Sequence, residues 1–260
     1  MNAARITALT ARSLARLVAD RVALGLVLLF FVLTLLELTM LLLQSSAADP
    51  AEKAAVFRTS AWSGGYEANV GFVALVLGLN ALAADIRRGT IFAVLARPVT
   101  RATVFVSSWL ASLALVWSLV LVRQVIVIAL YVGYGGRPDV PLFVGIAGLF
   151  AGTALALTAA ACLGAVLPVM YGALAVLGWA VLQGLAFAPL LGIGRYLALG
   201  LASLLPLVGR SGEDLTALLT GRSRELGAGL EALLYRACWT LLLLVVGQWL
   251  FTRRDLAPRI

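Results

Sequence analysis

Long apolar runs separated by short polar segments dominate the pattern of the chain. A helix rises about 1.5 Å per residue and the hydrocarbon core of a bilayer is about 30 Å thick, so about 20 apolar residues are enough to cross it. The pattern therefore predicts an all-α, polytopic membrane protein whose residues 1–260 form a single transmembrane domain. We expect six transmembrane helices, over residues 22–43, 68–84, 103–134, 142–167, 170–189 and 232–251.

The segments outside these runs differ in polarity. In residues 4–20, leucine and isoleucine recur on one helical face and arginine on another, which predicts an interfacial helix on the inner leaflet. Residues 45–65 and 209–231 are polar, and we expect them to be connectors. Residues 190–208 are apolar but interrupted by glycine, proline and arginine, so we expect short re-entrant or surface helices there rather than a full crossing.

The distribution of basic residues predicts the orientation in the membrane. Eleven of them fall on the side that carries both termini and seven on the other. Because cytoplasmic loops are enriched in lysine and arginine, we expect a multi-pass protein of the cell inner (plasma) membrane with both termini in the cytoplasm. The eleven are Arg5, Arg12, Arg16, Arg21, Arg87, Arg88, Arg97, Arg101, Arg253, Arg254 and Arg259.

Composition agrees with a membrane protein and excludes several kinds of site. The chain is 62% hydrophobic and 12% charged, with a mean hydropathy of +1.03. Its formal charge of +8 does not indicate nucleic-acid binding, because the basic residues lie at the ends of apolar runs. The absence of histidine, and of any lysine except Lys53, excludes histidine-based metal sites, serine–histidine triads and a Walker A phosphate-binding loop.

Residues 85–101 hold the densest cluster of charge and turn residues between two apolar runs. The acidic residue and arginine pair at 85–88 end the second run, because charges are costly at bilayer depth. Thr90 can then cap a short helix, and Pro98 ends it. The segment therefore predicts a two-turn amphipathic helix at the membrane surface with arginines at both ends. Thr100 can cap the helix that follows.

The order of these residues resembles the cytoplasmic loop between the second and third spans of ABC-2 type transporter permeases. That loop carries an acidic residue, Arg-Gly-Thr-Ile, a short apolar helix and Arg-Pro-Val. The resemblance implies the permease subunit of an ATP-driven exporter, paired with a second permease copy of the same or a different kind. It also implies that the loop is a cytoplasmic coupling helix that docks on a separate ABC ATPase, so that ATP binds the partner and this chain binds no cofactor. The residues implied in docking are Asp85, Arg87, Arg88, Gly89, Thr90, Ile91, Phe92, Leu95, Arg97 and Pro98.

Three other interpretations stay open. The loop could be a connector whose arginines only set the orientation. The chain could be a non-catalytic membrane scaffold or assembly factor. An integral membrane enzyme would need catalytic side chains clustered at one membrane face, and the scattered acidic residues and missing histidine argue against it.

A few polar residues are expected inside the membrane. Glu37 in the first span and Arg123 in the third both fall in the outer half when counted along each helix, so they can form an ion pair or contact a substrate. We expect Arg236, one turn into the sixth span, to extend its side chain to the membrane surface. Gly148 and Gly152 have the Gly-x-x-x-Gly spacing that lets helices approach closely.

Overall fold

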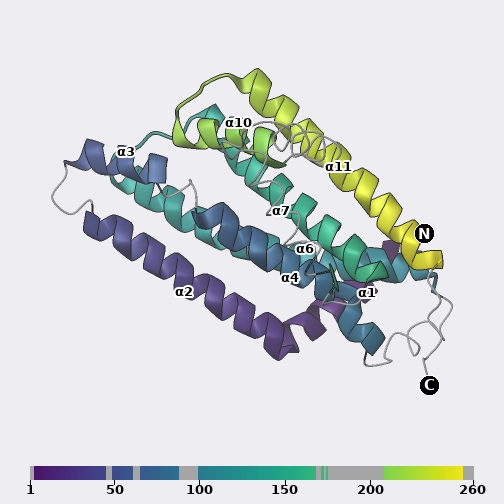
Figure 1. Cartoon of the computed structure of the whole chain (residues 1–260). Helices are drawn as coiled ribbons and strands as arrows, with labels where there is room; N and C mark the ends of the chain where they lie inside the picture. Colours follow the sequence, from purple (N-terminus) through teal and green to yellow (C-terminus); the bar gives the residue numbers. More distant parts are fainter. Residues whose placement is uncertain are drawn as a thin grey trace, which may run out of the picture.

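The computed structural model describes residues 3–44, 49–60, 65–87, 99–167, 171–172, 174 and 208–253 (Figure 1). Every regular element in these ranges is a helix, which confirms the all-α prediction. The helices run roughly side by side as an elongated bundle.

Four helices are long and apolar enough to cross a membrane. They are α2 (Arg21–Gln44), α6 (Arg101–Gly133), α7 (Val140–Val166) and α11 (Leu226–Arg253). The predicted spans at 22–43, 103–134, 142–167 and 232–251 lie on these helices.

The remaining two predicted spans are less complete in the structure. Helix α4 (Gly65–Arg87) contains the predicted span at 68–84, and its apolar stretch, Val70–Leu82, is shorter than those of the other four. The predicted span at 170–189 and the segment at 190–208 lie almost entirely outside the described residues. The count of six transmembrane helices therefore stays a prediction.

Two segments predicted to be connectors contain helices, which the sequence analysis did not predict. They hold α3 (Pro50–Ser60) and α10 (Val208–Thr220). In α10, three leucines at helical spacing are 1%, 1% and 0% exposed, and this face packs on α7. The segment is polar on average, but its leucines follow the 3.6-residue period of an amphipathic helix. The resulting apolar face is short but sufficient to hold the helix against the bundle. The three leucines are Leu215, Leu218 and Leu219.

The N-terminal helix α1 (Ala3–Ala19) occupies the range expected for an interfacial helix and is amphipathic. It packs against α6, and Leu9 on its apolar side contacts the hydrophobic core. Part of the apolar face that the sequence assigned to the lipid therefore contacts protein. The predicted position on the inner leaflet stays a prediction.

Helix α7 lies at the centre of the bundle and packs most extensively against α4 and α11 (Figure 1). Glycines on α7 also let helix α10 approach closely. A Cβ atom added at Gly145 would lie 2.5 Å from the Leu219 side chain of α10, and one added at Gly148 would lie 2.6 Å from that of Leu215. Of the Gly-x-x-x-Gly pair seen in the sequence, Gly148 thus faces α10, whereas Gly152 faces the Arg236 side chain of α11.

The contact between α4 and α7 is closer still, because it brings backbone against backbone. A Cβ atom at Gly78 of α4 would lie 2.5 Å from the carbonyl oxygen of Leu157. In the reverse direction, a Cβ atom at Gly164 of α7 would lie 2.5 Å from the carbonyl oxygen of Leu79. Each helix therefore places a glycine against the other's backbone. At these two points there is no room for a side chain between the helices.

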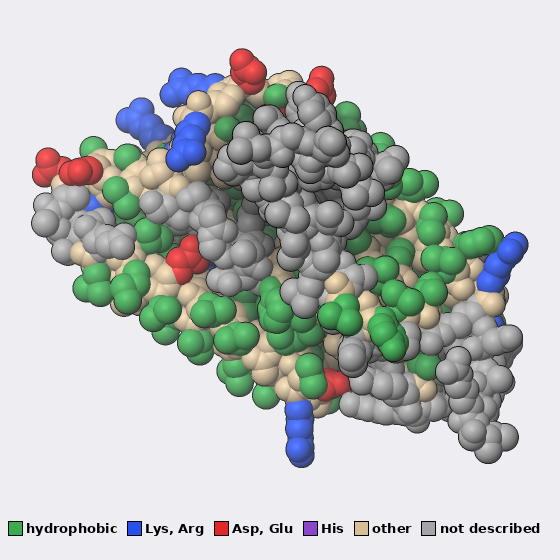
Figure 2. Space-filling view, in the orientation of Figure 1, with side chains coloured by type: hydrophobic (Ala, Val, Ile, Leu, Met, Phe, Trp, Pro, Cys, Tyr) green, Lys and Arg blue, Asp and Glu red, His purple; other side chains and the backbone are tan. Residues whose placement is uncertain are grey.

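Helix ends and turns meet at the two ends of the bundle. At one, the α1 end, α1 packs against α6, and the start of α6 meets the end of α11, where Arg101 donates to the Thr252 carbonyl at 3.3 Å (Figure 1). At the other, the α3 end, α3 meets the turn between α6 and α7 and the turn between α10 and α11. Figure 2 shows hydrophobic side chains along the flank of the bundle and charged ones mainly near its ends.

We predict that Gly78→Ala destabilises the bundle, because its methyl group would collide with the Leu157 backbone. Overpacking of this kind costs about 1–3 kcal/mol. Gly71→Ala is the matched control, since it lies in the same helix with nothing within 4 Å of the added Cβ. Thermal unfolding in detergent should give a lower midpoint for Gly78→Ala and an unchanged or higher one for Gly71→Ala. Equal midpoints would show that the close α4–α7 contact is absent.

Candidate functional site in the helix bundle

An ion pair links α2 to α6 inside the bundle. Arg123 Nη2 lies 3.5 Å from Glu37 Oε1, and the two side chains are 0% and 22% exposed. Counted along the helices, Glu37 lies about 10 Å and Arg123 about 15 Å from the helix ends that face α3. Because an unpaired charge is costly at this depth, each group lowers the cost of burying the other.

Arg236 of α11 does not extend to the membrane surface, so that expectation was wrong. The residue is 1% exposed, and its Nη1 atom donates to the Gly148 carbonyl of α7 at 2.7 Å. A Cβ atom at Gly152 would lie 2.5 Å from the same nitrogen. The guanidinium therefore occupies space that two glycines leave on α7, and a carbonyl there replaces water as its acceptor.

Two tryptophans of α6 bind α7, and the sequence analysis did not find them. Trp109 Nε1 donates to the Thr158 hydroxyl at 2.8 Å, and Trp117 Nε1 donates to the Phe150 carbonyl at 3.2 Å. The Trp117 and Phe150 rings also meet edge to face at 5.6 Å. A tryptophan in the middle of an apolar run is a usable signal, because its N–H requires an acceptor when buried.

These contacts fix helices to each other and form no reactive centre. Arg123 and Arg236 are each directed at an acceptor on a neighbouring helix. Within the part of the chain that the structure describes, no group of three or more His, Cys, Asp or Glu side chains could hold a metal ion. The arrangement can position the helices relative to one another.

The predicted coupling segment begins at the end of α4, at the α1 end of the bundle. Asp85 and Arg87 lie in the last turn of α4, whereas residues 88–98 lie outside the described residues. The assignment of the coupling residues therefore stays a prediction. The chain is described again at Val99, and Thr100 caps α6 as expected, its hydroxyl accepting from the Thr103 amide at 3.3 Å.

Comparison with known proteins identifies the family. The profile of the family described as ABC-2 family transporter protein matches residues 8–256, nearly the whole chain. The chain belongs to this family. No protein of curated function matches the chain. As an ABC-2 permease, the chain is a membrane transport component, which agrees with its apolar helices.

In this ABC-2 permease, we predict that losing Glu37 alone is worse than losing the whole ion pair. Glu37→Leu leaves the fully buried Arg123 without its carboxylate, whereas Glu37→Leu with Arg123→Met removes both charges. Breaking a buried pair typically costs about 3–5 kcal/mol, and replacing both partners by apolar groups costs much less. Unfolding in detergent should therefore show the double variant to be more stable than Glu37→Leu.

The same variants separate a structural from a transport role. A double variant that is stable and transports normally would assign the pair to helix packing, and one that is stable but inactive would assign it to the transport path. Strictly additive losses of stability would contradict the pairing itself.

Proposed function

We propose that the chain is the permease subunit of an exporter powered by a separate cytoplasmic ABC ATPase, with two permease copies forming the pathway. Membership of the ABC-2 family supports the transport role. The single lysine of the sequence, Lys53, stands in no Walker A motif, which supports the binding of ATP by a partner subunit.

The observation that carries this proposal is the position of α4. The helix leads directly into residues 88–98, where the predicted coupling helix lies, and it packs backbone to backbone on the central helix α7. The paired glycine contacts join α4 and α7 into one rigid unit. An ATPase that pushed on the segment after Arg87 would therefore move α7 together with the α10 and α11 helices packed on it.

We further infer that the α1 end faces the cytoplasm. The segments that adjoin this end along the chain contain eleven basic residues and three acidic ones. The segments at the α3 end have about as many acidic as basic residues. This asymmetry favours the cytoplasmic side for the α1 end, which is also where a soluble ATPase can reach the segment after α4.

The runner-up is a non-catalytic membrane scaffold or assembly factor. It also requires a stable bundle, but it does not require force to pass through α4. The two proposals therefore differ in what a change in the coupling segment should do.

We expect Phe92→Asp or Leu95→Asp to abolish co-purification with the ATPase, or transport, in a protein that still inserts. Each change would put a charge into the docking contact that the proposal assigns to this segment, and it keeps every arginine that sets orientation. The triple variant Arg87→Lys, Arg88→Lys and Arg97→Lys keeps the charge, so it should be harmless if these arginines only set the orientation. If both aspartate variants assemble and transport fully, the segment is a connector.

Accessibility to a membrane-impermeant thiol reagent tests the orientation. In a background with Cys162 and Cys238 replaced by alanine, Arg137→Cys at the α3 end should react in intact cells. Arg97→Cys should react only after permeabilisation. The opposite pattern would place the α3 end in the cytoplasm and overturn the inferred orientation.

A further inference from the structure

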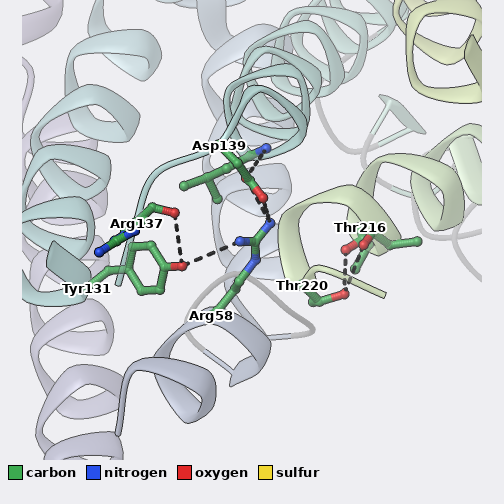
Figure 3. A network of polar contacts seen from close by, with 8 residues as sticks. Arg58, Tyr131, Arg137, Asp139, Thr216 and Thr220 are labelled. Carbon is green, nitrogen blue, oxygen red and sulfur yellow. Dashed lines mark hydrogen bonds and ion pairs between the residues drawn. The ribbon is translucent and has the colours of Figure 1, made fainter. Parts of the chain in front are cut away.

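An open pocket of about 240 Å³ lies at the α3 end, and none of the contacts described above uses it. It forms where α3, the start of α7 and the turn after α10 meet. The polar or turn-forming residues on its walls are Arg58, Thr59, Asp139, Thr220, Gly221 and Arg224. Several of them belong to the network of polar contacts in Figure 3.

Arg58 of α3 is the fixed cation of this pocket (Figure 3). Its Nη2 atom donates to both carboxylate oxygens of Asp139, at 2.9 and 3.0 Å, and its Nη1 atom donates to the Tyr131 hydroxyl at 3.4 Å. Burial acts to lower the pKa of Arg58, but the hydrogen bonds to Tyr131 and Asp139 and the charge of Asp139 raise this pKa above its ordinary value. Arg58 is therefore positively charged at every physiological pH.

The carboxylate of Asp139 already has two tasks. Besides binding Arg58, it caps α7 by accepting from the Leu142 amide at 3.1 Å. Its single negative charge is thus shared between a guanidinium and the positive end of a helix dipole. Little of that charge is left to balance a second cation in the same pocket.

Arg224 is that second cation. It is exposed, lines the pocket and forms no hydrogen bond or ion pair with any residue that the structure describes. The hydroxyls of Thr59 and Thr220 on the pocket wall donate to carbonyls of their own helices and supply no negative charge to balance Arg224. The pocket therefore has two guanidinium groups, one carboxylate already in use, and a net positive charge.

The conformation of the turn after α10 brings the two arginines to the same pocket. Gly221 has a φ of 74°, a conformation that glycine adopts readily, and a Cβ atom there would lie 2.7 Å from Arg58 Nε. The turn can therefore lie directly on the Arg58 side chain, with Arg224 three residues further along the chain. The close approach at Gly221 places a flexible guanidinium beside a fixed one.

We propose that this pocket binds a phosphate group, and that its occupant in the membrane is the phosphate of a lipid headgroup. Arginine recognises phosphate through several N–H donors in a planar fork. The pocket lies just past the ends of α6 and α7, two helices long and apolar enough to cross a membrane, so a lipid headgroup at the membrane surface could reach it. Its volume is below the range of about 300–1,000 Å³ that is typical for drug-sized ligands, so it suits a headgroup rather than a whole lipid.

This site requires only that the bundle spans a membrane and does not depend on an ATPase partner. Arg224→Ala is the decisive variant, because the exposed side chain has no protein partner among the described residues and its loss should leave the fold intact. Arg222→Ala is the matched control, since Arg222 is equally basic and exposed but does not line the pocket. The midpoint of thermal unfolding without ligand checks that both variants are folded.

The test uses the full chain in an uncharged detergent with three probes: short-chain phosphatidylglycerol, inorganic phosphate, and diacylglycerol with the same chains. Bound lipid is measured by native mass spectrometry, and phosphate by the shift of the unfolding midpoint. We expect the wild type and Arg222→Ala to bind phosphatidylglycerol alike and in preference to diacylglycerol. Arg224→Ala should bind it about tenfold more weakly, because it loses a hydrogen bond to a charged group.

Each outcome decides the matter. Arg224-dependent binding of the lipid alone supports a headgroup site, and Arg224-dependent binding of inorganic phosphate as well supports a site for the phosphate group itself. The proposal is overturned if the wild type binds neither probe or if it does not prefer phosphatidylglycerol to diacylglycerol. It is also overturned if Arg224→Ala binds phosphatidylglycerol as tightly as the wild type. The same holds if Arg222→Ala weakens binding as much as Arg224→Ala, since the attraction would then be a general effect of charge.

Discussion

The backbone contact between α4 and α7 is the constraint on which the other contacts in the bundle depend. Lipid is as apolar as a leucine side chain, so burying apolar surface between helices gains little in a membrane, and close packing has to hold them together. Gly78 and Gly164 provide that packing on one face of α7. Glycines on another part of α7 receive α10 and Arg236. One helix rich in small residues therefore positions three neighbours.

Buried cations supplement this packing toward the α3 end. Arg123 joins α6 to α2 and Arg236 joins α11 to α7, whereas the partly exposed Arg58 joins α3 to the N-cap of α7. Where the solvent is hydrocarbon, a donor cannot exchange its protein acceptor for water, so each link also specifies which helices are neighbours. At the α1 end, among the described residues, the ring of Phe105 meets that of Phe251 and Arg101 donates to the Thr252 carbonyl.

Local sequence patterns predicted well the properties that depend on a single helix. Apolar runs located the long helices, and depth counted along them predicted that Glu37 and Arg123 fall in the same half of the membrane, because both follow from a fixed rise per residue. Contacts between helices were not predictable in this way. Arg236 was assigned to the membrane surface because the sequence does not reveal that glycines of α7 make room for it. Helices α3 and α10 were missed because only two or three apolar residues in each face the bundle.

The direction of synthesis determines whether each buried arginine enters the membrane before or after its acceptor. Glu37 is made before Arg123, and Gly148 is made before Arg236, so each arginine enters the membrane after its acceptor. Inserting an arginine at the centre of a span costs about 2.5–3.5 kcal/mol on the insertion scale, and a waiting acceptor offsets part of that cost. Arg58 precedes Asp139, but α3 is not one of the membrane-spanning candidates, and water can solvate its guanidinium until α7 is complete. The order of residues along the chain thus suits vectorial insertion of the bundle from its N-terminus.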